Sequence, residues 1–288
     1  MEYAFYLGCN IPARVKQYED SARAILKRCG VRLVDIREFV CCGYPLRNIE
    51  LEAFILSSAE NLALAEKAGL EILALCKCCY GRLKKAEFLL KENENLWTDV
   101  NRVLAARGLQ YSGQTGIKHF LSVLYHDVGL DTLKREISRP FKQLKIAASV
   151  GCHALRPSNI TRFDDPVAPT IFDELVEVTG AVSVDWVTKM ECCGAPLMGF
   201  NDELGMNLTR LKLADGKKAG ADYICTACPF THLQFDSVQK LMISRNGNDP
   251  LAPILYAQLL GLSMGIDENT LGIGMNQLDI SGVTSFLT

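Results

Sequence analysis

The sequence lacks long hydrophobic runs and any marked excess of charge. No apolar segment approaches the roughly 18–20 residues that a membrane-crossing helix needs, and even residues 254–264 are interrupted by Gln258. The 31 basic and 33 acidic residues give a formal net charge of −2. This balance argues against nucleic-acid or anionic-membrane binding, because both need a large basic surface. Glu2 stands where a signal peptide would carry positive charge, so we expect a cytoplasmic protein without a transmembrane segment.

Two familiar redox signatures are also missing, namely the compact Cys-x-x-Cys-x-x-Cys run of ferredoxins and the Gly-x-Gly-x-x-Gly fingerprint of flavin-binding folds. The chain nevertheless contains 12 cysteines, and several stand too close together for ordinary cross-links. In a reducing cytosol, such groups are better explained as metal ligands. A structural zinc site closes with four ligands from two local pairs, whereas the adjacent pairs Cys41-Cys42 and Cys192-Cys193 could hold neighbouring irons of one cluster.

The two halves of the sequence repeat one another. Each half opens with an apolar run that ends in Gly-Cys and continues through a helix-period segment to a Cys-Cys-Gly-x-Pro-Leu motif. Each then has a second helical pattern and a further apolar run followed by a cysteine. The matched cysteines are Cys9 and Cys152, Cys41-Cys42 and Cys192-Cys193, and Cys76 and Cys228. This regularity is typical of an internal gene duplication.

Apolar runs that alternate with helical segments predict an α/β fold of two pseudo-repeated strand–helix–strand domains with largely parallel sheets. We expect a first domain at residues 1–140, with a helical insertion at about 91–140. The second domain should span residues 141–288 and include a buried helix at 253–265 and a tail. In such sheets the functional loops lie beyond the carboxyl ends of the strands. The cysteines of each half should therefore gather, with their metal clusters, at one edge of its sheet.

In the first half, 31 residues separate Cys9 from the pair Cys41-Cys42, and 33 residues that begin with Gly43 separate this pair from Cys76-x-x-Cys79. The second half repeats most of this pattern. The pattern resembles the CCG domain pair in the B subunit of heterodisulfide reductase. The resemblance implies an unusual non-cubane [4Fe–4S] cluster on five cysteines in each domain, with a disulfide cleaved between the two clusters. The implied ligands are Cys9, Cys41, Cys42, Cys76 and Cys79 for the first cluster, and Cys152, Cys192, Cys193 and Cys228 for the second.

The second half departs from the family pattern at its last position. Thr231 stands where the fifth ligand is expected, and Cys225 forms an alternative Cys-x-x-Cys on the other side of Cys228. Three interpretations stay open for the second site. Cys225 substitutes as the fifth ligand, four cysteines hold an ordinary cubane, or a non-cubane cluster takes a different fifth ligand. Cys78 is interpreted as a spare thiol or as an alternative ligand.

Other residues near these cysteines have candidate roles. His153 and His232 would lie beside the second cluster, where they could donate a proton to a departing thiolate or hydrogen-bond the cluster. A structural role at a strand or helix end is the alternative for both. Gly43 and Gly194 should permit close approach of the backbone to a cluster. His119 and His126, seven residues apart on a helical stripe, are expected to be buried or boundary histidines and not ligands.

The sequence thus predicts an iron–sulfur oxidoreductase subunit that reduces a small disulfide, such as the coenzyme M–coenzyme B heterodisulfide. Since the chain has no ferredoxin or flavin signature of its own, its electrons must come from another protein. As the partners that deliver them, the resemblance implies a ferredoxin-like C subunit together with a flavin-containing A subunit. The alternative is an electron-relay CCG subunit of a quinone- or organic-acid-linked complex, without disulfide chemistry of its own.

Overall fold

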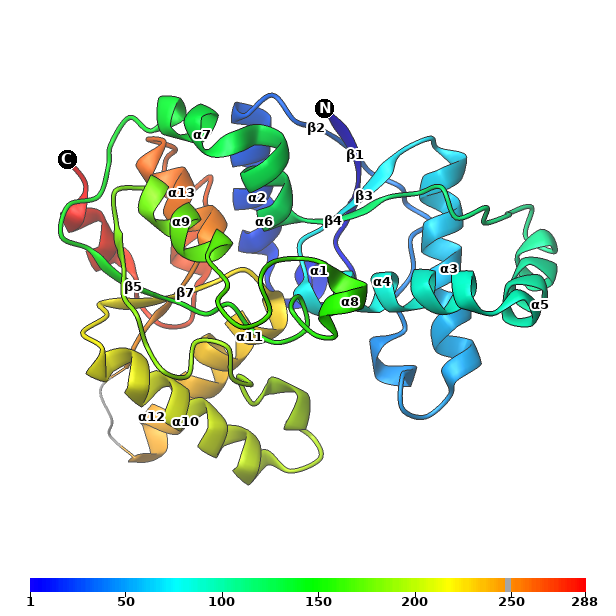
Figure 1. The fold of residues 1–288 in the computed structure, drawn as a ribbon. Helices are drawn as coiled ribbons and strands as arrows, with labels where there is room; N and C mark the ends of the chain where they lie inside the picture. The colour runs from blue at the N-terminus through cyan, green and yellow to red at the C-terminus, as the bar shows by residue number, and fades with distance from the viewer. Residues whose placement is uncertain (247–249) are drawn as a thin grey trace.

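Two four-stranded parallel sheets form the framework of the protein (Figure 1). The computed structural model describes residues 1–246 and 250–288. The first sheet has the order β2-β1-β3-β4, with β1 (Glu2–Tyr6), β2 (Arg32–Val34), β3 (Glu71–Ala74) and β4 (Ile117–His119). The second has the order β6-β5-β7-β8, with β5 (Lys145–Ala148), β6 (Val182–Ser183), β7 (Tyr223–Thr226) and β8 (Pro253–Leu255). The repeated order confirms the predicted α/β fold and its internal repeat.

Helices and short helical turns connect the strands. In the first half they are α1 (Asn10–Arg14), α2 (Lys16–Arg28), η1 (Tyr44–Leu46), α3 (Leu51–Lys67), α4 (Lys77–Glu92), α5 (Glu94–Ala105), α6 (Phe120–Ser122), η2 (Val123–Gly129) and α7 (Leu130–Glu136). In the second half they are α8 (Ser158–Thr161), α9 (Ile171–Val178), η3 (Ala195–Leu197), α10 (Asp202–Lys218), α11 (Pro229–Leu233), η4 (Gln234–Val238), α12 (Gln239–Asn246), α13 (Tyr256–Ser263), η5 (Ile273–Met275) and η6 (Ser281–Phe286). Within the described residues, no helix combines the length and the apolar character needed to cross a bilayer.

Two strands lie where only helix was expected. β4 falls inside the predicted helical insertion at about 91–140, and β8 forms the first three residues of the helix predicted at 253–265. Each strand pairs in parallel with a central strand of its sheet, β3 or β7, and passes directly into a helix. A three-residue strand is too short to show an alternating pattern. The expectation of continuous helix was therefore wrong at both places.

The two halves share one hydrophobic core. Helix α13 of the second half packs against α2 of the first (Figure 1). The ring of Tyr256, at the start of α13, contacts Phe172 of its own half at 5.7 Å and Phe120 of the other half at 6.5 Å between centroids. One cluster of buried apolar residues includes side chains from both sheets. This shared core fixes the carboxyl edge of one sheet relative to that of the other.

His119 ends β4 and caps the next helix. Its Nδ1 accepts a hydrogen bond from the backbone N–H of Leu121 at 3.2 Å. Its ring is completely buried between Tyr80 and Phe163, with centroid distances of 5.9 and 5.6 Å. This burial lowers the pKa of His119 to about 3. The structure thus supports the expectation of a buried histidine.

The buried His119 should make the protein sensitive to acid. Its folded-state pKa is below the unfolded value of about 6.5, so the neutral ring stabilises the fold above that pH. This contribution is lost as the pH falls, by about 2 kcal/mol between pH 7 and pH 5. We expect a His119→Asn variant, which keeps an acceptor for Leu121, to show a flatter decrease of thermal unfolding midpoint from pH 7 to pH 5. Parallel curves for the two proteins would contradict this assignment, because cluster loss affects both alike.

Candidate metal centre

The first group of cysteines lies beyond the carboxyl ends of three strands. Cys9 follows β1, Cys41-Cys42 lies in the loop after β2, and Cys76 caps the N-terminus of α4 directly after β3. Neighbouring thiols are within hydrogen-bonding reach of one another in the order Cys9, Cys41, Cys42, Cys79 and Cys76. The structure therefore brings together all five cysteines that the sequence assigns to the first site.

Helix α3 holds the Cys-Cys-Gly loop of this group in place. Ser58 Oγ donates a hydrogen bond to the carbonyl oxygen of Cys42 at 2.9 Å. The buried side chain of Asn61 accepts from the backbone N–H of Val40 at 2.8 Å and donates to the carbonyl oxygen of Cys41. Since these bonds are buried or partly buried, they fix the backbone that positions the two adjacent thiols.

Gly43 and Gly194 are required by the packing of their loops on a helix. Both have positive φ, +74° and +89°, which favours glycine. A Cβ atom at Gly43 would lie 2.9 Å from the carbonyl oxygen of Phe54 in α3, and one at Gly194 would clash with that of Gly205 in α10. The observed close approach is thus between loop and helix. That these glycines also adjoin a cluster stays a prediction.

The second group repeats this arrangement with one thiol fewer. Cys152 follows β5 and Cys192-Cys193 lies in the loop after β6. The thiols of Cys152 and Cys193 are both within hydrogen-bonding reach of Cys192. Thr231 faces this group, and its hydroxyl donates a hydrogen bond to Cys193 Sγ at 3.5 Å. A threonine hydroxyl therefore occupies the place that a fifth cysteine would take.

Helix α10 holds the second loop with a buried cation. Thr209 Oγ1 donates to the carbonyl oxygen of Cys193 at 2.9 Å, the same contact that α3 makes in the first half. Lys212 stands where α3 has Asn61 and is almost fully buried, and burial lowers its pKa to about 8. Its Nζ donates hydrogen bonds to three loop carbonyl groups, those of Thr188, Lys189 and Glu191. The second site therefore has a buried ammonium where the first has a neutral amide.

The two groups meet at the N-termini of α4 and α11. Cys228 caps α11 directly after β7, just as Cys76 caps α4 after β3. The Sγ atoms of Cys76 and Cys228 are 4.0 Å apart. The Sγ atom of Cys78 joins them, and all three sulfurs lie within 4.8 Å of one another. The nine cysteines assigned from the sequence pattern thus form two groups in contact.

A pocket opens on the second group's side of this junction. Its lining includes Cys78, Cys152, His153, Cys193, Cys228 and Thr231. The Nδ1 atom of His153 is 3.4 Å from Cys152 Sγ and 3.6 Å from Cys78 Sγ. This contact supports hydrogen bonding to sulfur as the role of His153. Cys225 is completely buried in β7 and is not part of the lining, so the structure does not bring it into the pocket.

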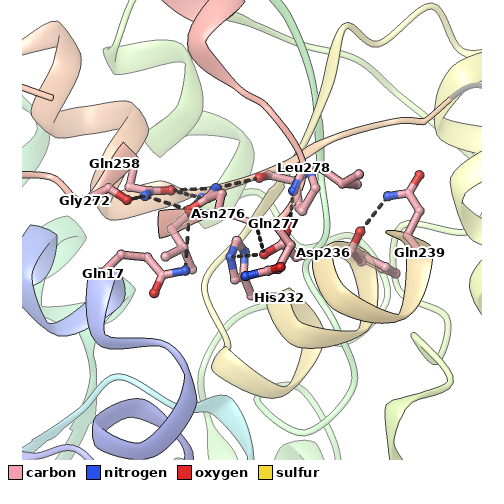
Figure 2. Close-up of polar contacts among 12 residues, drawn as sticks. Gln17, His232, Asp236, Gln239, Gln258, Gly272, Asn276, Gln277 and Leu278 are labelled. Atoms are coloured by element: carbon pink, nitrogen blue, oxygen red, sulfur yellow. Dashed lines mark hydrogen bonds and ion pairs between the residues drawn. The ribbon is translucent and has the colours of Figure 1, made fainter. Parts of the chain in front are cut away.

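His232 belongs to a different environment, a polar network that joins η4 to the C-terminal tail (Figure 2). Its Nε2 lies 3.8 Å from Asp236 Oδ2. Asp236 in turn accepts hydrogen bonds from the backbone N–H groups of Gln277 and Leu278, each at 2.8 Å. Burial lowers the pKa of His232 to about 3. His232 does not line the pocket, and its ring is buried beside Asp236.

Lys77 is a second buried cation that spacing alone did not reveal. It lies between Cys76 and Cys78 in α4 and is only 3% exposed. Its Nζ donates to the carbonyl oxygens of Ser149 and Val150 at 3.2 and 2.6 Å, and burial lowers its pKa to about 8. Because both carbonyls lie beyond β5, Lys77 links the first half to the second and places positive charge beside both thiol groups.

The donor set fits iron–sulfur clusters. It consists of sulfur alone, and thiolate is the ligand that such clusters use. A hydrogen bond from Cys42 lowers the pKa of Cys41, and one from Cys152 lowers that of Cys192. Hydrogen bonds from neighbouring thiols also lower the pKa of Cys76. Each group therefore contains at least one residue that is prone to form the thiolate, the species that binds metal. The buried ammonium groups of Lys77 and Lys212 would offset part of the negative charge of bound clusters.

Comparison with known proteins agrees with this geometry. The model of the CCG cysteine-rich domain matches residues 3–84 and 146–236. The chain is 35% identical over 280 residues to the B subunit of the ferredoxin/F420H2-dependent CoB–CoM heterodisulfide reductase of Methanosarcina acetivorans, covering 96% of this chain and 93% of that protein. It is 31% identical to a protein of Archaeoglobus profundus that is named as similar to the B subunit of heterodisulfide reductase, covering 97% and 96% of the two chains.

A relative with a different activity also matches along its length. The 8-methylmenaquinol:fumarate reductase membrane anchor subunit of Wolinella succinogenes is 30% identical over 280 residues, which cover 96% of this chain and 97% of that protein. Among solved structures, a hypothetical protein from Helicobacter pylori superposes with a TM-score of 0.75 at 17% identity. The match covers 97% of this chain and 52% of that chain, and it shows the fold alone.

Removing the charge of Lys77 should make bound clusters harder to reduce. A buried cation stabilises the additional electron, so a Lys77→Met variant should have cluster midpoint potentials that are more negative by roughly tens of millivolts. Anaerobic redox titration followed by electron paramagnetic resonance measures the shift. Lys91→Met, at the exposed end of the same helix, is the control and should leave the potentials unchanged. Equal potentials in the wild type and both variants would contradict the role of Lys77.

Proposed function

The chain belongs to the CCG cysteine-rich family that includes the B subunit of heterodisulfide reductase, and from this premise we propose that it is the disulfide-reducing component of a larger complex. In general terms, its role is electron transfer as an iron–sulfur component of an oxidoreductase complex. The observation that carries the proposal is the 4.0 Å contact between the sulfurs of Cys76 and Cys228, which places the two groups of cysteines side by side. The proposed partners are a flavin-containing A subunit together with a ferredoxin-like C subunit, both cytoplasmic like this chain.

The two groups would hold two [4Fe–4S]-type clusters, the first of them non-cubane. When bound, these clusters supply single electrons and iron with affinity for sulfur, which suits a disulfide that takes two electrons and two protons to give two thiols. The chain's own residues hold the clusters and tune them. His153 hydrogen-bonds sulfur at the pocket, and the backbone carbonyls beyond β5 orient Lys77 in the pocket's lining.

Positive side chains beside the pocket favour an anionic substrate. The guanidinium of Arg47 stacks on the ring of Tyr44 at 3.8 Å, and that ring contacts His153 at 5.4 Å. Burial lowers the pKa of His153, and the charges of Arg82 and Arg47 lower it further. The Nε atom of Arg82 is buried and has no hydrogen-bond partner among the described residues. These features support a disulfide with acidic groups, such as the coenzyme M–coenzyme B heterodisulfide.

A second candidate is an electron relay without disulfide chemistry, linked to a quinone or an organic acid. Two observations favour it, the likeness to the fumarate reductase anchor protein and the threonine at position 231. If the second group held a cubane on Cys152, Cys192, Cys193 and Cys228, its irons would have no open position. The second cluster would then pass electrons on without binding a substrate sulfur.

The proposal is tested on anaerobically purified protein. We expect about eight irons per chain with matching acid-labile sulfide, and stoichiometric release of thiols when the dithionite-reduced chain meets the coenzyme M–coenzyme B heterodisulfide. Zinc without sulfide would refute the redox role. Oxidation of the reduced chain by a soluble quinone but not by the disulfide would favour the relay instead.

Neutralising Arg82 should weaken binding of an anionic disulfide. An Arg82→Gln variant is expected to raise KM for the heterodisulfide by about tenfold, the loss of one charge-assisted contact, with little change for an uncharged disulfide. Arg102→Gln, on the exposed surface of α5, should behave as wild type. Equal increases of KM for charged and uncharged substrates would show that Arg82 acts through the fold and not through the substrate's charge.

A further inference from the structure

The second group of cysteines lacks a fifth thiol within its own half of the chain. Its three loop cysteines and Cys228 provide four thiols, and the fifth position carries Thr231. The Thr231 hydroxyl donates to Cys193 Sγ at 3.5 Å, so this side chain is directed at the group. A neutral hydroxyl is a much poorer ligand for iron in a sulfur cluster than thiolate is. The pocket therefore has a hydroxyl oxygen at the position where an iron–sulfur cluster needs a sulfur ligand.

Cys78 of the first half brings a sulfur to this same pocket. It lines the pocket together with Cys152, Cys193 and Cys228, and its Sγ is within 4.8 Å of Cys228 Sγ. The Nδ1 atom of His153 touches both Cys78 Sγ and Cys152 Sγ, at 3.6 and 3.4 Å. A thiol of one half and a thiol of the other thus share one hydrogen-bonding partner.

The internal repeat explains why Cys78 crosses over. Cys78 is the second residue after Cys76, and the matching residue after Cys228 is Phe230. The ring of Phe230 also reaches the opposite half, where it contacts Tyr44 at 5.9 Å. Residues at this position therefore face the other half in both repeats. In one repeat the residue is an apolar ring, and in the other it is a thiol.

A glycine permits the close approach that this arrangement needs. Gly81 lies one turn after Cys78 in α4, and a Cβ atom there would be 2.5 Å from the carbonyl oxygen of His153. Backbone atoms do not approach a Cβ atom so closely, so any other residue would push the loop at 151–153 away from α4. The absence of a side chain at Gly81 keeps Cys78 beside the second group.

We propose that Cys78 is the fifth cysteine ligand of the second cluster and replaces the thiolate that Thr231 does not supply. The inference rests on the proposed iron–sulfur function and extends it. The second cluster is then held by both halves of the chain, with four thiolates from the second half and one from the first. Cys225, which the sequence offered for this position, stays in the core.

The test compares anaerobically prepared Cys78→Ala, Cys225→Ala and wild-type protein by iron and sulfide content and by electron paramagnetic resonance and Mössbauer spectra. We expect Cys78→Ala to lose up to half of its iron, or to keep it with altered spectra of one cluster. Cys225→Ala is the matched control, a buried cysteine outside the pocket, and should resemble wild type. Unchanged iron and unchanged spectra in Cys78→Ala would overturn the proposal.

The double variant Cys78→Ala/Thr231→Cys separates ligand loss from damage to the fold. It restores the family's spacing within the second half, so we expect iron content and spectra to return toward wild-type values. If Cys78→Ala loses iron and the thiol added at position 231 restores none of it, the proposal is wrong. Wild-type protein that contains no iron and sulfide would refute the proposed function itself, whereas full wild-type loading with a silent Cys78→Ala variant refutes only the role of Cys78.

Discussion

The structure depends on the meeting of two helix N-termini, where Cys76 and Cys228 place their sulfurs 4.0 Å apart. Each cysteine follows a central strand of its sheet, β3 or β7, so the contact brings the carboxyl edges of the two sheets face to face. Such a contact needs a rigid frame, because the halves would otherwise be free to move apart. The shared core supplies that frame, with α13 packed on α2 and Gly81 allowing α4 to touch the opposite loop.

Charge is the second constraint at this junction. Several thiolates in a buried place repel one another, and the low dielectric strengthens that repulsion. The buried ammonium groups of Lys77 and Lys212 offset part of this negative charge. Both donate hydrogen bonds to backbone carbonyl oxygens of the loops. The halves differ here, since Lys212 takes the position of Asn61. Under the proposed function, the charge of Lys212 would stabilise an added electron at the second group more than the neutral amide of Asn61 does at the first.

Much of this architecture could be predicted from the sequence. Spacing and repetition gave the α/β fold, the parallel sheets and the five cysteines of the first group, because these depend on order within each half. β4 and β8 were missed since three residues carry no period. The position of His232 was equally hidden, because consecutive residues of a helix, here Thr231 and His232 in α11, point in directions about 100° apart. In the sequence, Lys77 and Cys78 stand out only as parts of the run Cys76-Lys77-Cys78-Cys79. Their roles depend on contacts with the other half of the chain, which the sequence does not show.

The contact between the two halves lets a residue of one half complete the site of the other. The cysteine spacing within one half does not predict this. In this fold, the residue two places after each capping cysteine, Cys78 or Phe230, faces the opposite half. A change in one repeat can therefore be compensated from the other. Under the proposal, the hydroxyl at position 231 and the sulfur at position 78, which line one pocket, are a pair of this kind. Because the two changes act on one pocket, their effects should be non-additive, as expected for residues in contact.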